Sequence, residues 1–370
     1  MKRLLRESSR LYGYKFMHLK SIQHGFVVNQ ETVRLLMHFL DPVGIEHRRR
    51  GRLQRRVYNN PGPDFMWHMD SYDKLKPYGF CINGAIDGFS RCLIWLEVYT
   101  TSSDPAVIGS YFLKAVASKL GCPVRVRADR GTENGHVEAM QTFLRLGHGN
   151  TFSSVPFMYG SSNHNQRIEA WWCFLRRHMA QFWMNIFQDM KNDNIFDGFF
   201  VDKSLLQFCF MQLIQFYITG NRRNIIDVVV SFMTPEVLIT FVSSQHLSSL
   251  ISRRFKRNEK NDLDHVVYLW DTHRIRRTRH QTVPSGRPNT MYHLPEAYGT
   301  HHYLCPVSSE EIQECQRYCP PKSMLPCDRD IYELCCLIMA ENNKSPPRDA
   351  FEAAMLYRFL RGIILQELQQ

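Results

Sequence analysis

The fold of this chain is decided by residues 65–99, which read FMWHMDSYDKLKPYGFCINGAIDGFSRCLIWLEVY. Three apolar runs, at 65–71, 80–87 and 92–99, are separated by segments that contain glycine, proline or serine. Short apolar runs bounded by turn residues are typical of strands. We therefore expect three consecutive strands in an antiparallel meander, with Asp70 inside the first of them.

Helix and strand patterns alternate after this meander. The expected elements are, in order, a helix over about 104–120 capped by Ser103 or Asp104, a strand over 123–128, a helix over 133–146, a strand over 151–155, a loop over 156–163 and a long amphipathic helix that begins near 163. An antiparallel meander followed by helix, strand and helix predicts an α/β domain with a mixed sheet and helices around it.

Other regions flank this central domain, which we place at residues 64–190. The flanking regions are a helical, helix-turn-helix-like unit over 1–46, a basic linker over 47–63, a helical extension over 191–258 and a mixed region over 259–370, which contains a β-like segment at 266–270 and ends in helices at 328–340 and 348–367. In the first unit, Asn29 is expected to cap a helix with Val33, Leu36, Met37 and Leu40 on one face. Such a unit can enter a major groove, but any small helical bundle shows the same pattern.

The charge of the chain is unevenly distributed. The formal net charge is +11, and residues 47–56 hold six of the basic side chains, namely Arg48, Arg49, Arg50, Arg52, Arg55 and Arg56. Such a run can neutralise phosphates along a nucleic acid or act as a nuclear-import signal, and its plain alternative is a solvated linker. We expect DNA as the partner and the nucleus as the location.

Composition argues against a membrane or secreted protein. Hydrophobic residues make up 44% of the chain, yet no apolar run approaches the ~18 residues of a membrane span. The N-terminal residues lack the apolar core of a secretory signal. We therefore expect a soluble protein whose eleven cysteines remain thiols in a reducing compartment.

Three carboxylates are the candidates for chemistry. Asp70, Asp129 and Glu169 fall on three different expected elements, which allows them to converge. Crowded carboxylates repel one another, and a hard divalent cation such as Mg²⁺ or Mn²⁺ would relieve that repulsion. Two such ions ~3.5–4 Å apart can drive displacement at a phosphodiester. Arg130 and Arg167 lie beside these carboxylates and could hold phosphates, although thirty-five acidic residues guarantee many accidental triples.

Several motifs around these carboxylates resemble, in order, those of the retroviral integrase and DDE transposase superfamily. They are Trp67-His68-Met69-Asp70, Ile86-Asp87-Gly88-Phe89-Ser90-Arg91, Ala128-Asp129-Arg130-Gly131-Thr132-Glu133-Asn134 and Ser162-Asn163-His164-Asn165-Gln166-Arg167-Ile168-Glu169. The resemblance implies a ribonuclease H-like fold with a mixed five-stranded sheet. It also implies catalysis by Asp70, Asp129 and Glu169 with two Mg²⁺ or Mn²⁺ ions, DNA 3′-end processing and strand transfer, and a homo-oligomer.

The departures from that family keep two other functions open. Retroviral integrases begin with a His-His-Cys-Cys zinc module, whereas the first cysteine here is Cys81. The whole chain is similar to integrase-core proteins of eukaryotic genomes that derive from mobile elements, so one alternative is a catalytically silent protein that binds DNA or chromatin. The other is a ribonuclease H-like nuclease that acts on RNA–DNA hybrids.

A few residues have competing interpretations. A zinc site is one interpretation of His301, His302, Cys305, Cys315, Cys319 and Cys327, although their spacing fits no common zinc motif. For Trp171 and Trp172 we expect core packing, with one of them exposed in part. Asp73, Asp87 and Glu133 lie near the proposed ligands, and Asp87 is expected to anchor the turn at Gly88.

Overall fold

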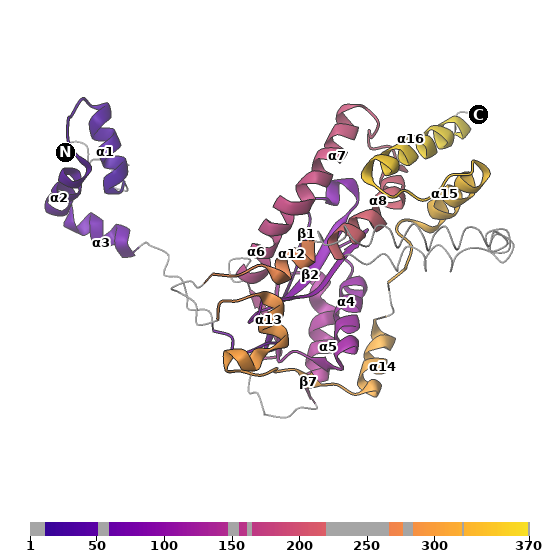
Figure 1. Ribbon diagram of the computed structural model, residues 1–370, viewed down its shortest axis with the longest axis horizontal. Coiled ribbons are helices and arrows are strands. Elements are labelled where there is room, and N and C mark those ends of the chain that lie inside the picture. Colours follow the sequence, from indigo (N-terminus) through magenta and orange to yellow (C-terminus); the bar gives the residue numbers. More distant parts are fainter. Residues whose placement is uncertain are drawn as a thin grey trace. The chain divides into compact units, whose positions relative to one another are not determined.

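The computed structural model describes residues 12–50, 59–146, 155–160, 165–219, 266–276, 284–319 and 322–368 (Figure 1). The chain divides into two compact units, Met1–Tyr58 and Asn59–Gln370. In the described part of the chain, no helix is both long and apolar enough to cross a membrane.

A mixed five-stranded sheet forms the centre of the second unit, as the sequence predicts. Its strands are β1 (Met66–Tyr72), β2 (Cys81–Asp87), β3 (Leu93–Tyr99), β5 (Arg125–Asp129) and β6 (Phe157–Gly160), in the spatial order β3-β2-β1-β5-β6. The β1, β2 and β3 strands pair antiparallel and form the expected meander, whereas β5 pairs parallel with both β1 and β6. This architecture agrees with a ribonuclease H-like fold.

The last strand of the sheet lies within a segment for which the sequence predicts a loop. We expected a strand over 151–155 and a loop over 156–163, and the loop prediction was wrong for residues 157–160, because they form β6. The pairing begins where the carbonyl of Pro156 accepts a hydrogen bond of 2.9 Å from the Val126 N–H. Proline lacks an N–H group and is therefore found at the start of a strand. Residues 151–154 and 161–164 lie outside the described residues.

Helices cover both faces of this sheet (Figure 1). The helices α4 (Pro105–Lys119) and α5 (Gly135–Leu146) lie on one face, and α6 (Gln166–Leu175), α7 (Gln181–Asn192) and α8 (Asp202–Thr219) lie on the other. Trp67 and Met69 of β1 belong to the hydrophobic cluster with α4, whereas Tyr72 belongs to the cluster with α6. Because alternate residues of a strand point to opposite faces, Asp70 points toward the α6 face.

The turn after β2 is held by Asp87, as expected. Its Oδ2 accepts hydrogen bonds of 2.7 Å from the backbone N–H and from the hydroxyl of Ser90, and one of 3.1 Å from the Phe89 N–H. Arg91, next in the chain, adopts a left-handed conformation with φ of 66°. This tight turn sets the register of β2 against β3.

A side chain of α8 covers the edge of the sheet formed by β3. Gln215 accepts a hydrogen bond of 2.7 Å from the Val98 N–H and donates one of 3.1 Å to the Leu96 carbonyl. Its amide therefore pairs with β3 as a neighbouring strand would, which protects an edge that is otherwise open to further strand pairing.

The C-terminal part packs on the same unit. Its elements are α12 (Val266–Thr272), α13 (Pro288–His293), β7 (Cys305–Pro306), which pairs with β4 (Gly121–Cys122), α14 (Ser309–Tyr318), α15 (Arg329–Glu341) and α16 (Ala350–Glu367). The two helices predicted at the end of the chain are confirmed. The β-like segment predicted at 266–270 is wrong, because α12 is a helix. Val266 and Trp270 lie one helical turn apart and are both buried, so packing overrides the strand preference of the Val-Val-Tyr sequence.

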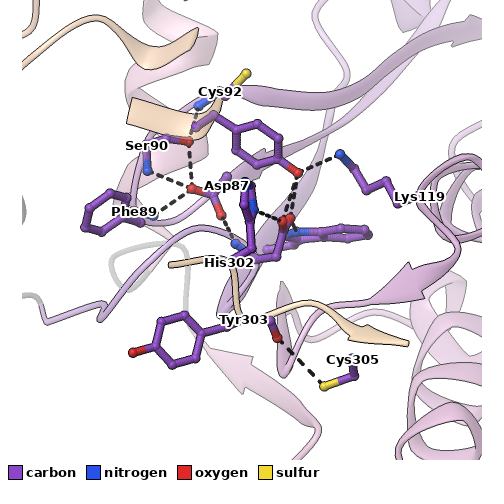
Figure 2. A network of polar contacts seen from close by, with 11 residues as sticks. Asp87, Phe89, Ser90, Cys92, Lys119, His302, Tyr303 and Cys305 are labelled. Atoms are coloured by element: carbon purple, nitrogen blue, oxygen red, sulfur yellow. Dashed lines mark hydrogen bonds and ion pairs between the residues drawn. The ribbon is translucent and has the colours of Figure 1, made fainter. Parts of the chain in front are cut away.

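A buried polar network ties this C-terminal part to the start of β1 (Figure 2). Asp64 accepts hydrogen bonds of 2.9 Å from Trp67 Nε1 and 2.8 Å from the Tyr292 hydroxyl, and its Oδ2 lies 2.9 Å from His302 Nδ1. The Asp64 N–H donates to Asp87 Oδ1 at 2.8 Å. Burial, with the nearby Asp64 charge, raises the pKa of Asp87 to about 7. Segments far apart in the sequence therefore fix the strand that carries Asp70.

The first unit is helical, as expected. It contains α1 (Tyr14–Gln23), α2 (Gln30–Leu40) and α3 (Pro42–Arg50). Asn29 caps α2 by accepting a hydrogen bond of 2.7 Å from the Thr32 N–H, and Val33 and Met37 are buried against Met17. Leu36, which was expected on the same face as Val33 and Met37, is 38% exposed. The side chains of Arg48, Arg49 and Arg50, and all of Arg52, Arg55 and Arg56, lie outside the described residues.

Candidate active site

Two of the three candidate carboxylates lie on neighbouring parallel strands. The pairs Met66 with Arg125 and His68 with Arg127 fix the register of β1 against β5. The same register, carried two residues further, sets Asp70 level with Asp129 at the end of β5. Side chains at equivalent positions of adjacent strands are neighbours on one face of a sheet.

The third carboxylate, Glu169, lies in the first turn of α6, and Asn165 fastens that turn to β1. Asn165 is 1% exposed, and its Nδ2 donates a hydrogen bond of 2.9 Å to the Met69 carbonyl. The backbone carbonyl of Asn165 accepts a hydrogen bond of 3.3 Å from the Glu169 N–H. Asn165 is therefore a positioning residue that joins the backbone of Glu169 to the residue before Asp70.

His68 completes this attachment. Its Nδ1 lies 2.8 Å from Asn165 Oδ1. Burial lowers the pKa of His68 to about 3, so the ring is neutral near pH 7 and Nδ1 carries the proton that it donates to the amide oxygen. Sequence reasoning missed this pair: Asn165 looks like an ordinary helix cap, yet its side chain bonds to β1 and makes no capping bond.

Asp70 is held by a tryptophan from α6. Trp172 Nε1 donates a hydrogen bond of 2.8 Å to Asp70 Oδ2. Burial raises the pKa of Asp70 to about 6, and the negative charges of Asp129 and Glu169 add to the rise, while the bonds from Trp172 and the Ser71 N–H oppose it. Trp171 and Trp172 are 0% and 5% exposed, so the expectation that one of them is exposed was wrong.

The ionised forms of Asp129 and Glu169 are also disfavoured. Burial raises the pKa of both, and the nearest negative neighbours are Glu133 for Asp129 and Asp129 for Glu169. Asp129 Oδ1 is buried, and no described residue donates a hydrogen bond to it. The three carboxylates therefore lie within electrostatic range of one another.

This arrangement suits a hard divalent cation. An unsatisfied buried carboxylate oxygen and mutual repulsion among acids are both relieved by a positive charge, and carboxylates are the ligands that Mg²⁺ and Mn²⁺ prefer. Within the described ranges, however, no three His, Cys, Asp or Glu side chains are gathered closely enough to hold one ion. The three carboxylates influence one another electrostatically, but their side chains do not converge closely enough to share one ion.

The basic residues near these acids differ in exposure. Arg130, directly after Asp129, is exposed, as are Arg176 and Arg177 in the π-helical turn that follows α6. Arg167 is only 8% exposed and acts electrostatically on His68. Exposed guanidinium groups can contact phosphates directly, so Arg130 has the better access of the two residues that sequence reasoning selected.

The remaining sequence candidates have other contacts. Asp73 accepts a hydrogen bond of 3.0 Å from Ser102 and pairs with Lys76 at 3.4 Å. Glu133 remains close enough to Asp129 to raise its pKa. Of the possible zinc ligands, His302 is bonded to Asp64, and Cys319 Sγ donates to the Ala106 carbonyl at 2.9 Å.

Comparison with known families finds a match for part of this unit. Residues 57–225 match the family model described as integrase core domain. Residues 57–225 are thus similar to an integrase core domain. The resemblance to the retroviral integrase and DDE transposase superfamily is thereby confirmed for this part of the chain, and the motifs around Asp70, Asp129 and Glu169 all lie within it. The comparison with curated proteins found no match.

Proposed function

We propose that this integrase core is a DDE-type polynucleotidyl transferase for DNA 3′-end processing and strand transfer. Asp70, Asp129 and Glu169 would hold two Mg²⁺ or Mn²⁺ ions. The observation that carries the proposal is the charge crowding of these acids: burial and the other two carboxylates raise the pKa of Asp70 to about 6, and Asp129 Oδ1 has no donor among the described residues.

Bound divalent ions would activate an attacking hydroxyl and stabilise the departing 3′ oxygen at a phosphodiester. The residues of the chain orient the ligands for that chemistry. Trp172 fixes one oxygen of Asp70 and leaves the other available, and Asn165 with His68 holds the first turn of α6 against β1. Arg130, exposed beside Asp129, would bind a backbone phosphate.

The partner and the location follow from the same proposal. Integrase-type domains act on DNA, and the arginines between 48 and 56 would add contacts to its phosphate backbone. We further propose that the same arginine run directs the chain to the nucleus and that several copies assemble on DNA ends.

The experiment compares the wild-type chain with Glu169→Gln on labelled duplex DNA with Mn²⁺. We expect nicking or joining by the wild type and at least a 100-fold lower rate for the variant, because electrostatic stabilisation at a metal-bound phosphate is lost. The matched control is Glu138→Gln on α5, a half-buried acid that accepts a hydrogen bond from Tyr159 and is not one of the three proposed ligands, and it should keep the wild-type rate.

Equal rates for the wild type and Glu169→Gln would contradict the proposal. Binding to DNA that weakens steeply with salt, without metal-dependent turnover on any DNA end, would favour a DNA-binding protein that keeps the integrase fold. Cleavage of RNA–DNA hybrids in excess of duplex-DNA joining would favour a nuclease.

A further inference from the structure

Two buried cysteines face each other across a short pair of strands, β4 and β7, outside the five-stranded sheet. Cys122 of β4 and Cys305 of β7 are direct partners in the antiparallel register. Directly opposite residues of such a pair have Cα atoms about 4.5–5.5 Å apart, which lies within the range of about 4.4–6.8 Å that a disulfide bond spans. Neither cysteine is in a disulfide bond. The backbone already holds them at bonding distance.

The two sulfur atoms interact, and an arginine acts on one of them. Arg145 of α5, only 6% exposed, donates a hydrogen bond of 2.9 Å from Nη1 to Cys305 Sγ. A guanidinium is always charged, and its bond to sulfur favours the thiolate, the form that reacts. The hydrogen bond between the two sulfurs raises the pKa of Cys122, so that thiol keeps its proton. The pair therefore contains one sulfur that accepts a hydrogen bond from a guanidinium and one neighbouring thiol.

A glycine allows the two strands to approach. A Cβ atom at Gly121 would lie 2.5 Å from Leu304 Cγ and 2.9 Å from the Cys305 carbonyl oxygen, which is too close for either contact. The absence of a side chain at 121 therefore sets Cys305 against Cys122.

We propose that Cys122 and Cys305 form a redox pair that a peroxide converts into a disulfide bond. The Cys305 thiolate attacks one oxygen of hydrogen peroxide; an S–O bond forms, the O–O bond breaks and hydroxide leaves. The Cys122 sulfur then attacks Cys305 Sγ, and the S–O bond breaks as the hydroxyl group departs with the Cys122 proton as water. The two thiols lose two electrons and two protons, and the peroxide is reduced to two molecules of water.

The bond would join the C-terminal part covalently to the integrase core. Cys305 follows His302, which bonds to Asp64, and Tyr303, whose N–H donates a hydrogen bond of 2.9 Å to the Pro63 carbonyl just before β1 (Figure 2). Oxidation would therefore fix the position of the segment that contacts the start of β1, the strand that carries Asp70. The disulfide bond would involve none of Asp70, Asp129 and Glu169, so its formation can be tested independently of the proposed function.

The test treats the full chain with hydrogen peroxide, blocks the remaining thiols with N-ethylmaleimide in denaturant, and identifies linked peptides by mass spectrometry. We expect a peptide that joins Cys122 to Cys305, and a Tm about 5–10 °C higher than in the reduced chain, because the bond closes a long loop. The Tm shift should disappear in Cys305→Ser and persist in the matched control Cys336→Ser, which removes an exposed thiol.

Two further variants examine the role of the arginine. Arg145→Gln should slow formation of the bond about 10-fold, whereas Arg145→Lys, which keeps the charge, should restore most of the rate. Circular dichroism establishes that each variant is folded. The proposal is overturned if peroxide fully modifies the exposed Cys173 and Cys336 while Cys122 and Cys305 are recovered as maleimide-labelled thiols, or if Arg145→Gln leaves the rate unchanged.

Discussion

At the scale of single residues, burial dominates the chemistry of the candidate site. Asp70 has its pKa raised to about 6 chiefly because it is taken out of water, and the neighbouring Asp129 and Glu169 charges only add to this effect. The sequence predicts the identity of these acids through their motifs. It does not predict the partners of Asp70, because Trp172 is far away in the chain and resembles any core tryptophan.

Replacing Asp70 with asparagine should stabilise the metal-free chain at neutral pH. The folded-state pKa of about 6 lies above the ordinary 3.8, so this carboxyl favours folding below about pH 3.8, and that contribution is lost as the pH rises through 6. Asn is neutral throughout. Thermal or urea unfolding should therefore show Asp70→Asn to be more stable by about 1–3 kcal/mol near pH 8, with little difference near pH 4.

The control for this prediction is Asp73→Asn, whose carboxylate side chain is 47% exposed, and which should show no comparable gain at pH 8. A stability difference between Asp70→Asn and the wild type that is the same at both pH values would contradict the assignment of the raised pKa to Asp70.

At the scale of elements, α6 is the helix on which the site depends. An amphipathic pattern that begins near residue 163 and contains Glu169 was enough to predict the helix from sequence. The contact that positions α6 could not be predicted. The sequence of α12 is typical of a strand, and α12 contacts α6 only through residues that are distant in the chain. Trp270 of α12 packs edge-on against Trp171 of α6, with ring centroids 5.3 Å apart, and its Nε1 donates to the Arg91 carbonyl at 2.7 Å.

Truncation of this contact should destabilise the chain and disturb the site together. Trp270→Ala is expected to lower the free energy of unfolding by about 3–5 kcal/mol, because a buried tryptophan is lost. Trp270→Phe should restore most of the packing. The matched control is Tyr268→Ala on the same helix; Tyr268 is 50% exposed, so the change should be below about 1 kcal/mol. Equal losses in both alanine variants, measured by urea unfolding, would argue against this role of α12.

At the scale of the whole molecule, the chain combines a region that matches the integrase core family with segments that this match does not cover. The match ends at residue 225, yet residues 284–307 hold the start of β1 through Asp64. The meander, the order of the later helices and the two C-terminal helices were predicted, because local periodicity and turn residues determine them. The Asp64 network and the β4–β7 pair were not, because long-range contacts leave no local pattern.

The arginine run should contribute a nonspecific term to DNA binding. Each phosphate contact changes the slope of log Kd against log salt by about 0.9, so replacement of Arg52, Arg55 and Arg56 by glutamine should reduce the slope by up to about 3. The matched control replaces Arg317, Arg329 and Arg358, three exposed arginines of the C-terminal helices, and should leave the slope unchanged. Identical slopes for both triple variants, measured by fluorescence anisotropy on duplex DNA, would remove the run from the DNA interface.

The central claim is that Asp70, Asp129 and Glu169 together hold divalent cations. The most direct measurement is calorimetric titration of the full chain with Mn²⁺ near pH 8, above the pKa of about 6 of Asp70. Binding of two ions per chain, lost in Asp129→Asn and Glu169→Gln and retained in Asp73→Asn, is the expected result. Failure of the folded wild type to bind Mn²⁺, or binding that survives unchanged in both Asp129→Asn and Glu169→Gln, would contradict it.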